Sequence, residues 1–232
     1  MADNLKAQPP AGAARPEAEG LRDRLDFERR VAAQILGAAR ISIVLASASP
    51  RRRDLLGTIL PTFDVIPADI LEVPRPRETA RRFASRAARE KAAHVAADHR
   101  ARSVLGADTV VTVDGDILGK PRDRTDAVRM LESLSGRTHR VITAIALTTF
   151  SGDTDELAVE SEVRFRSLSA DELGAYVDTG EPFDKAGAYA VQGGGGRFVK
   201  AVVGSYSNVI GLPLVEVARL LAGRCEPGRI DG

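Results

Sequence analysis

The sequence predicts an α/β fold in which a mixed β-sheet is flanked by helices. First, apolar runs of strand length alternate with longer stretches of helical periodicity. Second, some neighbouring strands are joined by tight turns and others by helices, so antiparallel and parallel pairs should share one sheet. Third, 232 residues with 44% hydrophobic and 28% charged side chains suit a sizeable globular domain.

Both ends of the chain are expected to lie outside that domain, which should span residues 41–224. Residues 1–40 form an N-terminal extension, and roughly its first half is rich in Ala, Pro and Gly, which is typical of disorder. A helix is expected at 21–38, where apolar side chains recur at loosely helical spacing, either packed on the domain or dangling from it. Residues 225–232 are expected to form a short C-terminal tail.

The first part of the domain should alternate strands with helices. The run ISIVLAS, residues 41–47, is β-branched and ends in small residues, as in a strand buried on both faces. Ser49 and Pro50 then supply an N-cap and a first-turn proline, so a helix is expected over 51–60. The next two elements are a strand and a long Ala- and Arg-rich helix, at residues 62–70 and 77–98.

A hairpin and further strands and helices complete the domain. Residues 102–118 form a strand pair, because Asp114 and Gly115 are a strong signal for a two-residue hairpin turn. The next helix should be capped by Thr125 and stopped by Gly136. The remaining elements are two strands, a capped helix, a strand–glycine turn–strand unit and a closing helix, at residues 138–150, 156–168, 169–180, 185–211 and 212–223.

The composition argues against nucleic-acid and membrane partners. The 33 Lys and Arg residues against 32 Asp and Glu leave a formal charge of +1, so no overall field attracts nucleic acid or anionic lipid. Aromatic residues make up only 4% of the chain, which leaves little for base stacking. No apolar run approaches the roughly 18 residues of a membrane span. We therefore expect neither kind of partner.

The cysteine and histidine content favours a cytoplasmic protein without zinc. A single cysteine, Cys225, excludes an intramolecular disulfide and fits a reducing compartment. The N-terminus lacks the apolar segment of a secretory signal. The three histidines have no matching cysteines nearby, so a zinc site is not expected.

The stretch SASPRRR, residues 47–53, is a candidate anion site. A strand, a loop of small residues and a helix N-terminus leave N–H groups free, and the helix dipole favours negative charge there. Ser47 and Ser49 add hydroxyl donors. Arg51 and Arg52 stand in the first turn, where a cation costs about 0.3–1 kcal/mol unless an anion offsets it. A solvated basic helix face fits the same pattern about as well.

Asp108, in VLGADTVV, is the strongest candidate for catalysis. It interrupts an apolar run at the expected end of a buried strand, where an unpaired carboxylate is costly. Because α/β sheets bind ligands at strand ends, metal binding or activation of water is favoured over satisfying a nearby turn. Lys120, in a loop between a glycine and a proline, has two interpretations: a phosphate-neutralising cation and a solvated side chain.

Several further residues are ambiguous when taken singly. Gln192 is expected to end a strand before four glycines, and its amide suits the reading of a base edge, although a turn is the alternative. The glycines lack the Walker lysine and the Rossmann spacing. Glu72 and Lys91 would ordinarily be surface charges. Together, the phosphate-binding cations, the carboxylates and the amide are the groups expected for hydrolysis of a phosphoanhydride with a hard divalent cation.

Seven segments between Ile41 and Ala222 match the motifs of a known family in the same order. They are LASASPRRRDLL, REKA, GADTVV, GKPRD, LSGRTHRVITAIAL, DKAGAYAVQG and GSYSNVIGLPLVE. The chain thus resembles the Maf family of nucleoside triphosphate pyrophosphatases. The resemblance implies a Maf/inosine-triphosphatase-like fold, with an elongated mixed sheet, a cleft between two lobes and a homodimeric assembly. It also implies hydrolysis of a nucleoside triphosphate to the monophosphate and pyrophosphate with a divalent cation, Mg²⁺ or Mn²⁺.

The same motifs imply roles for individual residues. Asp108 matches the family's proton acceptor. Arg51, Thr109 and Gln192 occupy three positions that track substrate choice, and this combination resembles the branch that acts on dTTP and UTP. The residues implied in substrate or metal binding are Ser47, Ser49, Arg52, Lys91, Lys120 and Lys185 for the phosphates and Glu72 and Asp108 for the metal. Leu71 stands where the family often has a second acidic residue, which would leave the metal more dependent on Asp108 and the phosphates.

These roles lead to a hypothesis for the reaction and for its place in nucleotide-pool house-cleaning. Asp108 deprotonates a water that attacks the α-phosphorus, while cations take up charge on the pyrophosphate, namely Arg52, Lys91 and Lys120. Two alternatives remain open: the branch that acts on 7-methyl-GTP, and a non-catalytic nucleotide-binding regulator of cell division. A panel of triphosphates distinguishes the two branches, and turnover with Mg²⁺ distinguishes an enzyme from a binder.

Overall fold

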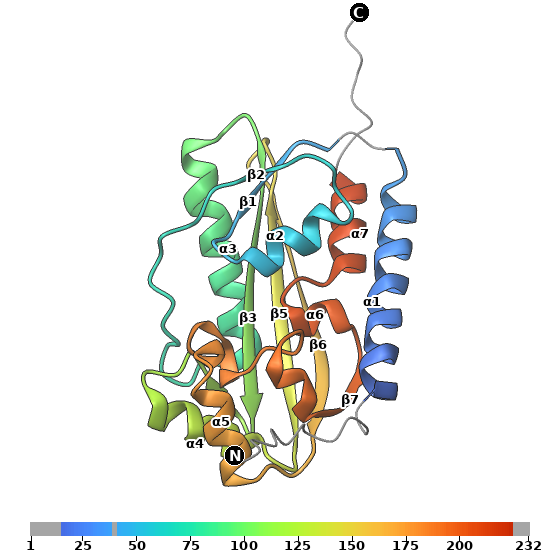
Figure 1. Cartoon of the computed structure of the whole chain (residues 1–232). Helices are drawn as coiled ribbons and strands as arrows, with labels where there is room; N and C mark the ends of the chain where they lie inside the picture. The colour runs from blue at the N-terminus through green and yellow to red at the C-terminus, as the bar shows by residue number, and fades with distance from the viewer. Residues whose placement is uncertain (1–14, 39–40, 225–232) are drawn as a thin grey trace, which may run out of the picture.

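The computed structural model describes residues 15–38 and 41–224, with a seven-stranded sheet at its centre (Figure 1). The strands are β1 Ile43–Ala46, β2 Asp64–Val65, β3 Ser103–Val113, β4 Asp116–Leu118, β5 Thr138–Thr148, β6 Thr154–Phe165 and β7 Val199–Val203. Their order is β2-β1-β3-β5-β6-β7, with β4 paired to β3. β1 is parallel to β2 and β3, and every other pair is antiparallel. The predicted mixed sheet is therefore confirmed.

Helices cover both faces of the sheet. They are α1 Arg15–Leu36, α2 Pro50–Gly57, α3 Ala80–Asp98, α4 Arg124–Leu134, α5 Ala170–Val177, α6 Tyr206–Ile210 and α7 Leu214–Arg224, with 3₁₀ turns η1 Glu181–Asp184, η2 Ala186–Ala188 and η3 Gly194–Phe198. Helix α3 packs on one face, and α1 and α7 lie side by side on the other (Figure 1). In β1, Ile43 and Leu45 belong to the larger core, whereas Val44 and Ala46 pack with α3 residues. This strand is buried on both faces, as predicted.

Strand pairing along one edge of β3 is interrupted, and the candidate site lies at this gap. β1 pairs with β3 only as far as Gly106, and β4 pairs with it only from Val111 onward. In the described chain, residues 107–110 therefore pair with a strand on the β5 side alone. Successive side chains of a strand point to opposite faces, so both faces of β3 can contribute to a ligand site at the gap. Asp108 lies within β3 and not at its end, but it stands just beyond the end of β1.

Three element boundaries differ from the sequence prediction. Helix α1 begins at Arg15, so the last residues of the segment expected to be disordered are helical, with Pro16 tolerated in the first turn. The second strand is reduced to two residues of β2. The N-cap of α4 is Asp123, whose Oδ1 accepts the Asp126 N–H at 2.8 Å, and not Thr125. The predictions for residues 1–14 and 225–232 lie outside the described residues.

The prediction for residues 185–211 was wrong in two places. The expected strand before the glycines is replaced by 3₁₀ turns, because Gly187 and Ala188 have φ of 70° and 59°, which no extended strand adopts. After the glycines β7 forms as expected, but the chain then turns into α6. The Ser205 hydroxyl starts that helix by accepting the Asn208 N–H at 3.1 Å. Over residues 15–38 and 41–224, no helix combines the length and apolar character that a membrane crossing requires.

His139 is a buried base in the core, and it leads to a prediction about acid stability. Its Nε2 lies 2.8 Å from the Tyr189 hydroxyl, and burial lowers the pKa of His139 to about 4. A base whose pKa falls on folding stabilises the fold above its unfolded pKa, near 6.5, and this stability is lost as the pH falls towards 4. We expect His139 to reduce the free energy of unfolding by about 3 kcal/mol over that interval, measured by urea unfolding.

Two histidine variants test this assignment. His139→Gln should remove most of the loss of stability between pH 6.5 and 4, because Gln carries no proton in this range. His94→Gln, at an exposed position on α3, should retain it. If H139Q followed the wild-type pH dependence, another group would be responsible.

Candidate active site

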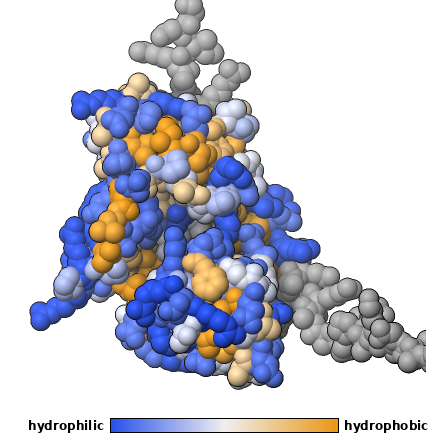
Figure 2. Space-filling model, turned by 60° about the vertical axis from the view of Figure 1, so that its left-hand side comes forward, coloured by the Kyte–Doolittle hydropathy of each residue, from blue (hydrophilic) through white to orange (hydrophobic). Residues whose placement is uncertain are grey.

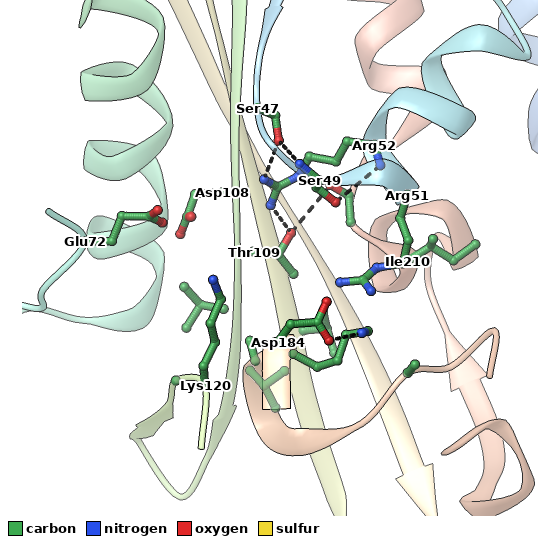
Figure 3. A pocket seen from close by; sticks show the side chains of 18 of the residues that line it. Ser47, Ser49, Arg51, Arg52, Glu72, Asp108, Thr109, Lys120, Asp184 and Ile210 are labelled. Atoms are coloured by element: carbon green, nitrogen blue, oxygen red, sulfur yellow. Dashed lines mark hydrogen bonds and ion pairs between the residues drawn. The ribbon is translucent and has the colours of Figure 1, made fainter. Parts of the chain in front are cut away.

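A cleft of about 590 Å³ opens at the gap beside β3 (Figure 3). Hydrophilic and apolar side chains both border the hollow between the upper and lower parts of the molecule (Figure 2). Every residue predicted for the site lines this cleft: Ser47, Ser49, Arg51, Arg52, Glu72, Lys91, Asp108, Thr109, Lys120, Lys185 and Gln192. Segments far apart in the sequence therefore meet in one place, and the expected cleft is present.

On one wall of the cleft, Lys91 lies between two carboxylates. Its Nζ, on α3, donates to Asp108 Oδ1 at 2.7 Å and to Glu72 Oε2 at 2.6 Å. Lys91 and Asp108 are only 6% and 5% exposed, so their charges are largely removed from water. An ammonium group has three N–H donors, and Lys91 therefore retains one for a ligand.

The two carboxylates of this cluster differ in their affinity for protons. Burial raises the pKa of Asp108 to about 6, although the charges of Lys91 and Arg52 oppose the rise. Partial burial also acts to raise the pKa of Glu72, but its contacts with Asp108 and Lys91 outweigh that effect and lower it. A carboxylate that titrates near neutral pH beside one that stays ionised is a suitable general base.

Arg86 holds the loop that carries Glu72. Its guanidinium donates to the Val73 carbonyl at 2.9 Å and to both carboxylate oxygens of Glu78, at 2.8 and 2.7 Å. The neighbouring Leu71 is 84% exposed and does not line the cleft. Of these two neighbouring residues, only Glu72 lines the cleft.

Arg52 is fixed on another wall by three uncharged oxygens. Its Nε donates to the Gly211 carbonyl at 2.9 Å, Nη2 to Thr109 Oγ1 at 2.9 Å and Nη1 to Ser47 Oγ at 3.3 Å. These contacts orient the guanidinium without neutralising it. An anion in the cleft would complete the pairing of its charge.

The direction of the Thr109 hydroxyl follows from its neighbours. Thr143 Oγ1 donates to the Asn208 carbonyl at 2.9 Å, so it must accept the hydrogen of the Thr109 hydroxyl, 3.0 Å away. Thr109 Oγ1 in turn accepts from Arg52. The Thr109 hydroxyl, held by Thr143, therefore helps to fix the position of the Arg52 guanidinium, and its predicted role in substrate choice stays a prediction.

The remaining wall carries the other residues predicted for substrate choice and charge. The Arg51 and Asp184 side chains point toward one another across the cleft, and Lys120 points toward Asp108 (Figure 3). Lys185 Nζ donates to Asp184 Oδ1 and, at 3.3 Å, to the Glu181 carbonyl. Gln192 is exposed at the edge of the cleft. Positive side chains thus face the carboxylate cluster.

The glycine run binds a carboxylate of the protein itself. The N–H groups of Gly194 and Gly195 donate to Glu181 at 3.0 and 3.4 Å, and the Tyr176 hydroxyl donates to it at 2.7 Å. A Cβ at Gly193 would lie 2.5 Å from the same carboxylate oxygens. Gly194 and Gly195 therefore anchor the chain that follows Gln192, and Gly193 leaves room for the carboxylate.

The donors near Asp108 fit a hard divalent cation only in part. Mg²⁺ is commonly held by one or two carboxylates together with water and substrate phosphates. Glu72 and Asp108 provide such carboxylates, but over residues 15–38 and 41–224 no group of three or more potential metal-ligating side chains occurs. The remaining ligands would have to come from the substrate and water.

Sequence reasoning missed several residues that build the site. Gly211 supplies a backbone carbonyl to Arg52, which no side-chain pattern reveals. Thr143 and Asn208 lie inside quoted motifs, yet their hydrogen bonds join segments remote in sequence. Asp184 was not among the predicted site residues, although it lines the cleft and points toward Arg51.

Comparisons with known proteins show which proteins this chain resembles. The family profile described as "Maf-like protein" matches residues 42–224. A dTTP/UTP pyrophosphatase of Myxococcus xanthus is 50% identical over 186 residues, covering 80% of this chain and 94% of that protein. The dTTP/UTP pyrophosphatase of Geobacter sulfurreducens is 52% identical over 178 residues, covering 75% and 92%. A solved HAM1 protein from Coxiella burnetii superimposes with a TM-score of 0.47 at 15% identity, over 79% of this chain and 100% of that one.

Proposed function

The chain belongs to the Maf-like protein family, and from that premise we propose that it hydrolyses dTTP and UTP to the nucleoside monophosphate and pyrophosphate. The observation that carries the proposal is the buried Asp108, whose pKa is raised to about 6 and which faces a wall of arginine and lysine side chains. This combination provides a base for water and cations for a polyphosphate in the same cleft.

In the proposed mechanism, Asp108 accepts a proton from the water that attacks the α-phosphorus. Lys91 holds Asp108 and Glu72 in place through its two hydrogen bonds and keeps a third donor for a phosphate oxygen. Arg52 and the exposed Lys120 bind the phosphates of the substrate and stay bound to them as they leave as pyrophosphate. Positioning and charge stabilisation supply most of the rate enhancement in such a reaction.

We also propose a divalent cation, Mg²⁺ or Mn²⁺, as cofactor. Glu72 and Asp108 would hold it, and it would withdraw electron density from the phosphates. The substrate triphosphate should be the main partner, without nucleic acid or membrane, in a cytoplasmic homodimer. The near-neutral charge supports the absence of nucleic-acid binding.

A nucleotide panel tests the proposed function. Pyrophosphate release is measured with Mg²⁺ and with Mn²⁺ for dTTP, UTP, CTP, ATP, GTP and 7-methyl-GTP. Preferential turnover of dTTP and UTP is expected. Preference for 7-methyl-GTP would assign the chain to the other branch, and tight binding of dTTP without turnover would indicate a regulator.

Gln192 should affect the choice of nucleotide more than the maximal rate. Gln192 is exposed and lines the cleft, next to a glycine run that Glu181 holds through the Gly194 N–H. We expect Gln192→Ala to reduce the preference for UTP over CTP by about tenfold, the value of one well-made hydrogen bond, with kcat for UTP within about threefold of wild type. Gln34→Ala, at an exposed glutamine of α1, is the control and should change neither. An equal loss of kcat for both nucleotides would contradict a role in selectivity.

A further inference from the structure

Glu28, on α1, is a buried carboxylate whose partners all belong to one short segment. It is 9% exposed, and its Oε1 accepts the Tyr206 N–H at 2.7 Å. Its Oε2 accepts the Ser207 N–H at 2.9 Å and the Ser205 hydroxyl at 3.1 Å. Three donors at the start of α6 therefore satisfy this carboxylate, and hydrogen bonds to an ionised acceptor are among the stronger ones in proteins.

A second side chain of α1 fastens the preceding residues. Arg24 donates to the Val202 carbonyl at 2.6 Å and to the Gly204 carbonyl. Helix α1 thus holds the chain from the end of β7 into α6, while it runs beside α7 (Figure 1). Residues 15–36 precede the part of the chain that matches the family profile, residues 42–224. The helix that makes these contacts therefore lies outside the region that the family profile matches.

The segment that α1 holds, within residues 202–211, also orients Arg52. At its far end, the Gly211 carbonyl accepts from Arg52 Nε at 2.9 Å. In its middle, the Asn208 carbonyl accepts from Thr143 Oγ1, which fixes the hydroxyl of Thr109 against Arg52. The Asn208 amide also bonds to β5 and β6, so α6 is tied to the sheet as a unit.

We propose that Glu28 is a positioning residue for substrate phosphate binding, acting through α6 on the guanidinium of Arg52. The chain of contacts runs from Glu28 to the N–H groups of α6, and from Asn208 and Gly211 to Arg52. Helix α1 is then part of the binding apparatus and not only an addition to the surface. The proposal rests on the proposed function, since it assigns Arg52 to the substrate's phosphates.

Kinetics of two Glu28 variants and one control test the proposal. Glu28→Ala removes the acceptor, and Glu28→Gln keeps the size but loses the charge. We expect a rise in KM for dTTP of about three- to tenfold in Glu28→Ala, a smaller rise in Glu28→Gln, and kcat within about twofold of wild type. Asp23→Ala, at an exposed acid on the same helix, should leave both constants unchanged.

A double-substitution experiment shows whether the effect passes through Arg52. Arg52→Met alone should raise KM, and adding Glu28→Ala to it should raise KM no further if Glu28 acts only through this side chain. If Glu28→Ala raised KM by the same factor in the wild type and in Arg52→Met, the proposal would be overturned. A Glu28→Ala protein with a lowered Tm but a wild-type KM would also overturn it, because that result indicates a purely structural role.

The outcome can be separated from that of the proposed function. If the wild-type protein turns over no triphosphate, the proposed function fails, and the same variants are compared by calorimetry with inorganic pyrophosphate as the probe. Weaker pyrophosphate binding in Glu28→Ala but not in Asp23→Ala would support the positioning role. Equal binding by both would overturn it.

Discussion

Asp108→Asn is expected to lower kcat for dTTP by about 10²–10⁴-fold, the usual contribution of a general base. Asn has nearly the same shape and can still accept the Lys91 hydrogen bond, which is 2.7 Å long in the wild-type protein. It cannot take a proton from water. Pyrophosphate release under saturating dTTP measures the loss, and the change should appear in kcat more than in KM.

The same variant should fold at least as stably as the wild type at neutral pH. Burial raises the pKa of Asp108 to about 6, so its contribution to stability is fully present below its unfolded pKa, near 4, and is lost as the pH rises through 6. Asn avoids that loss because it is neutral throughout. The Tm of metal-free D108N at pH 7 should therefore not fall below that of wild type.

Two results would contradict the role of Asp108. Near wild-type turnover in D108N would show that another group activates the water. A large fall in Tm would show that lost activity reflects unfolding. Asp116→Asn, at an exposed acid in the same hairpin, is the control and should leave kcat and Tm unchanged.

Local chemistry explains which parts of the fold could be predicted. The Asp114–Gly115 turn has φ of 53° and 92°, as its sequence requires, and Ser169 caps α5 with a full capping box. These elements depend on neighbouring residues alone. The segment before the glycines, by contrast, is not a strand, because Ala188 adopts a left-handed conformation. The glycines after it are held by the carboxylate of Glu181, which lies thirteen residues before Gly194.

The motifs identified residues that line the cleft, but they did not show which contacts hold those residues in place. Asp108 and Arg52 stand out because a charge at a buried strand or a helix start needs an explanation. Their partners do not stand out. A backbone carbonyl at Gly211 and the glutamate of a separate helix, Glu28, have no sequence signal that links them to the site. Such contacts follow only from the tertiary packing.

The interruption in the sheet explains why one cleft can use both faces of β3. Asp108 is on the α3 side, where it meets Lys91, and Thr109 is on the other side, where it meets Arg52. A continuous strand beside β3 would separate these two groups of residues. The gap between β1 and β4 lets Asp108, the proposed base, and Arg52, the proposed phosphate-binding arginine, face the same cleft.

Gly106→Ala should destabilise the protein by about 3 kcal/mol, at the upper end of overpacking effects, because the new methyl group meets backbone. A Cβ at Gly106 would lie 2.2 Å from the Ala88 carbonyl oxygen and 2.8 Å from the Ala92 nitrogen, both on α3. Neither atom can move without shifting the helix. The Tm should fall by roughly 6–12 °C, measured by calorimetry.

The substitution should also lower activity in the molecules that remain folded, because the turn of α3 that rests on Gly106 carries Lys91. Moving this turn outward would lengthen the 2.7 Å contact between Lys91 and Asp108 and release both carboxylates from their common partner. Gly174→Ala is the matched control: its nearest neighbour is the flexible end of Arg124 at 3.5 Å, so it should gain up to about 1 kcal/mol of helix propensity and keep full activity. A wild-type Tm for Gly106→Ala would show that α3 can move easily at this point. The distance between Lys91 and Asp108 would then not depend on the absence of a Cβ at Gly106.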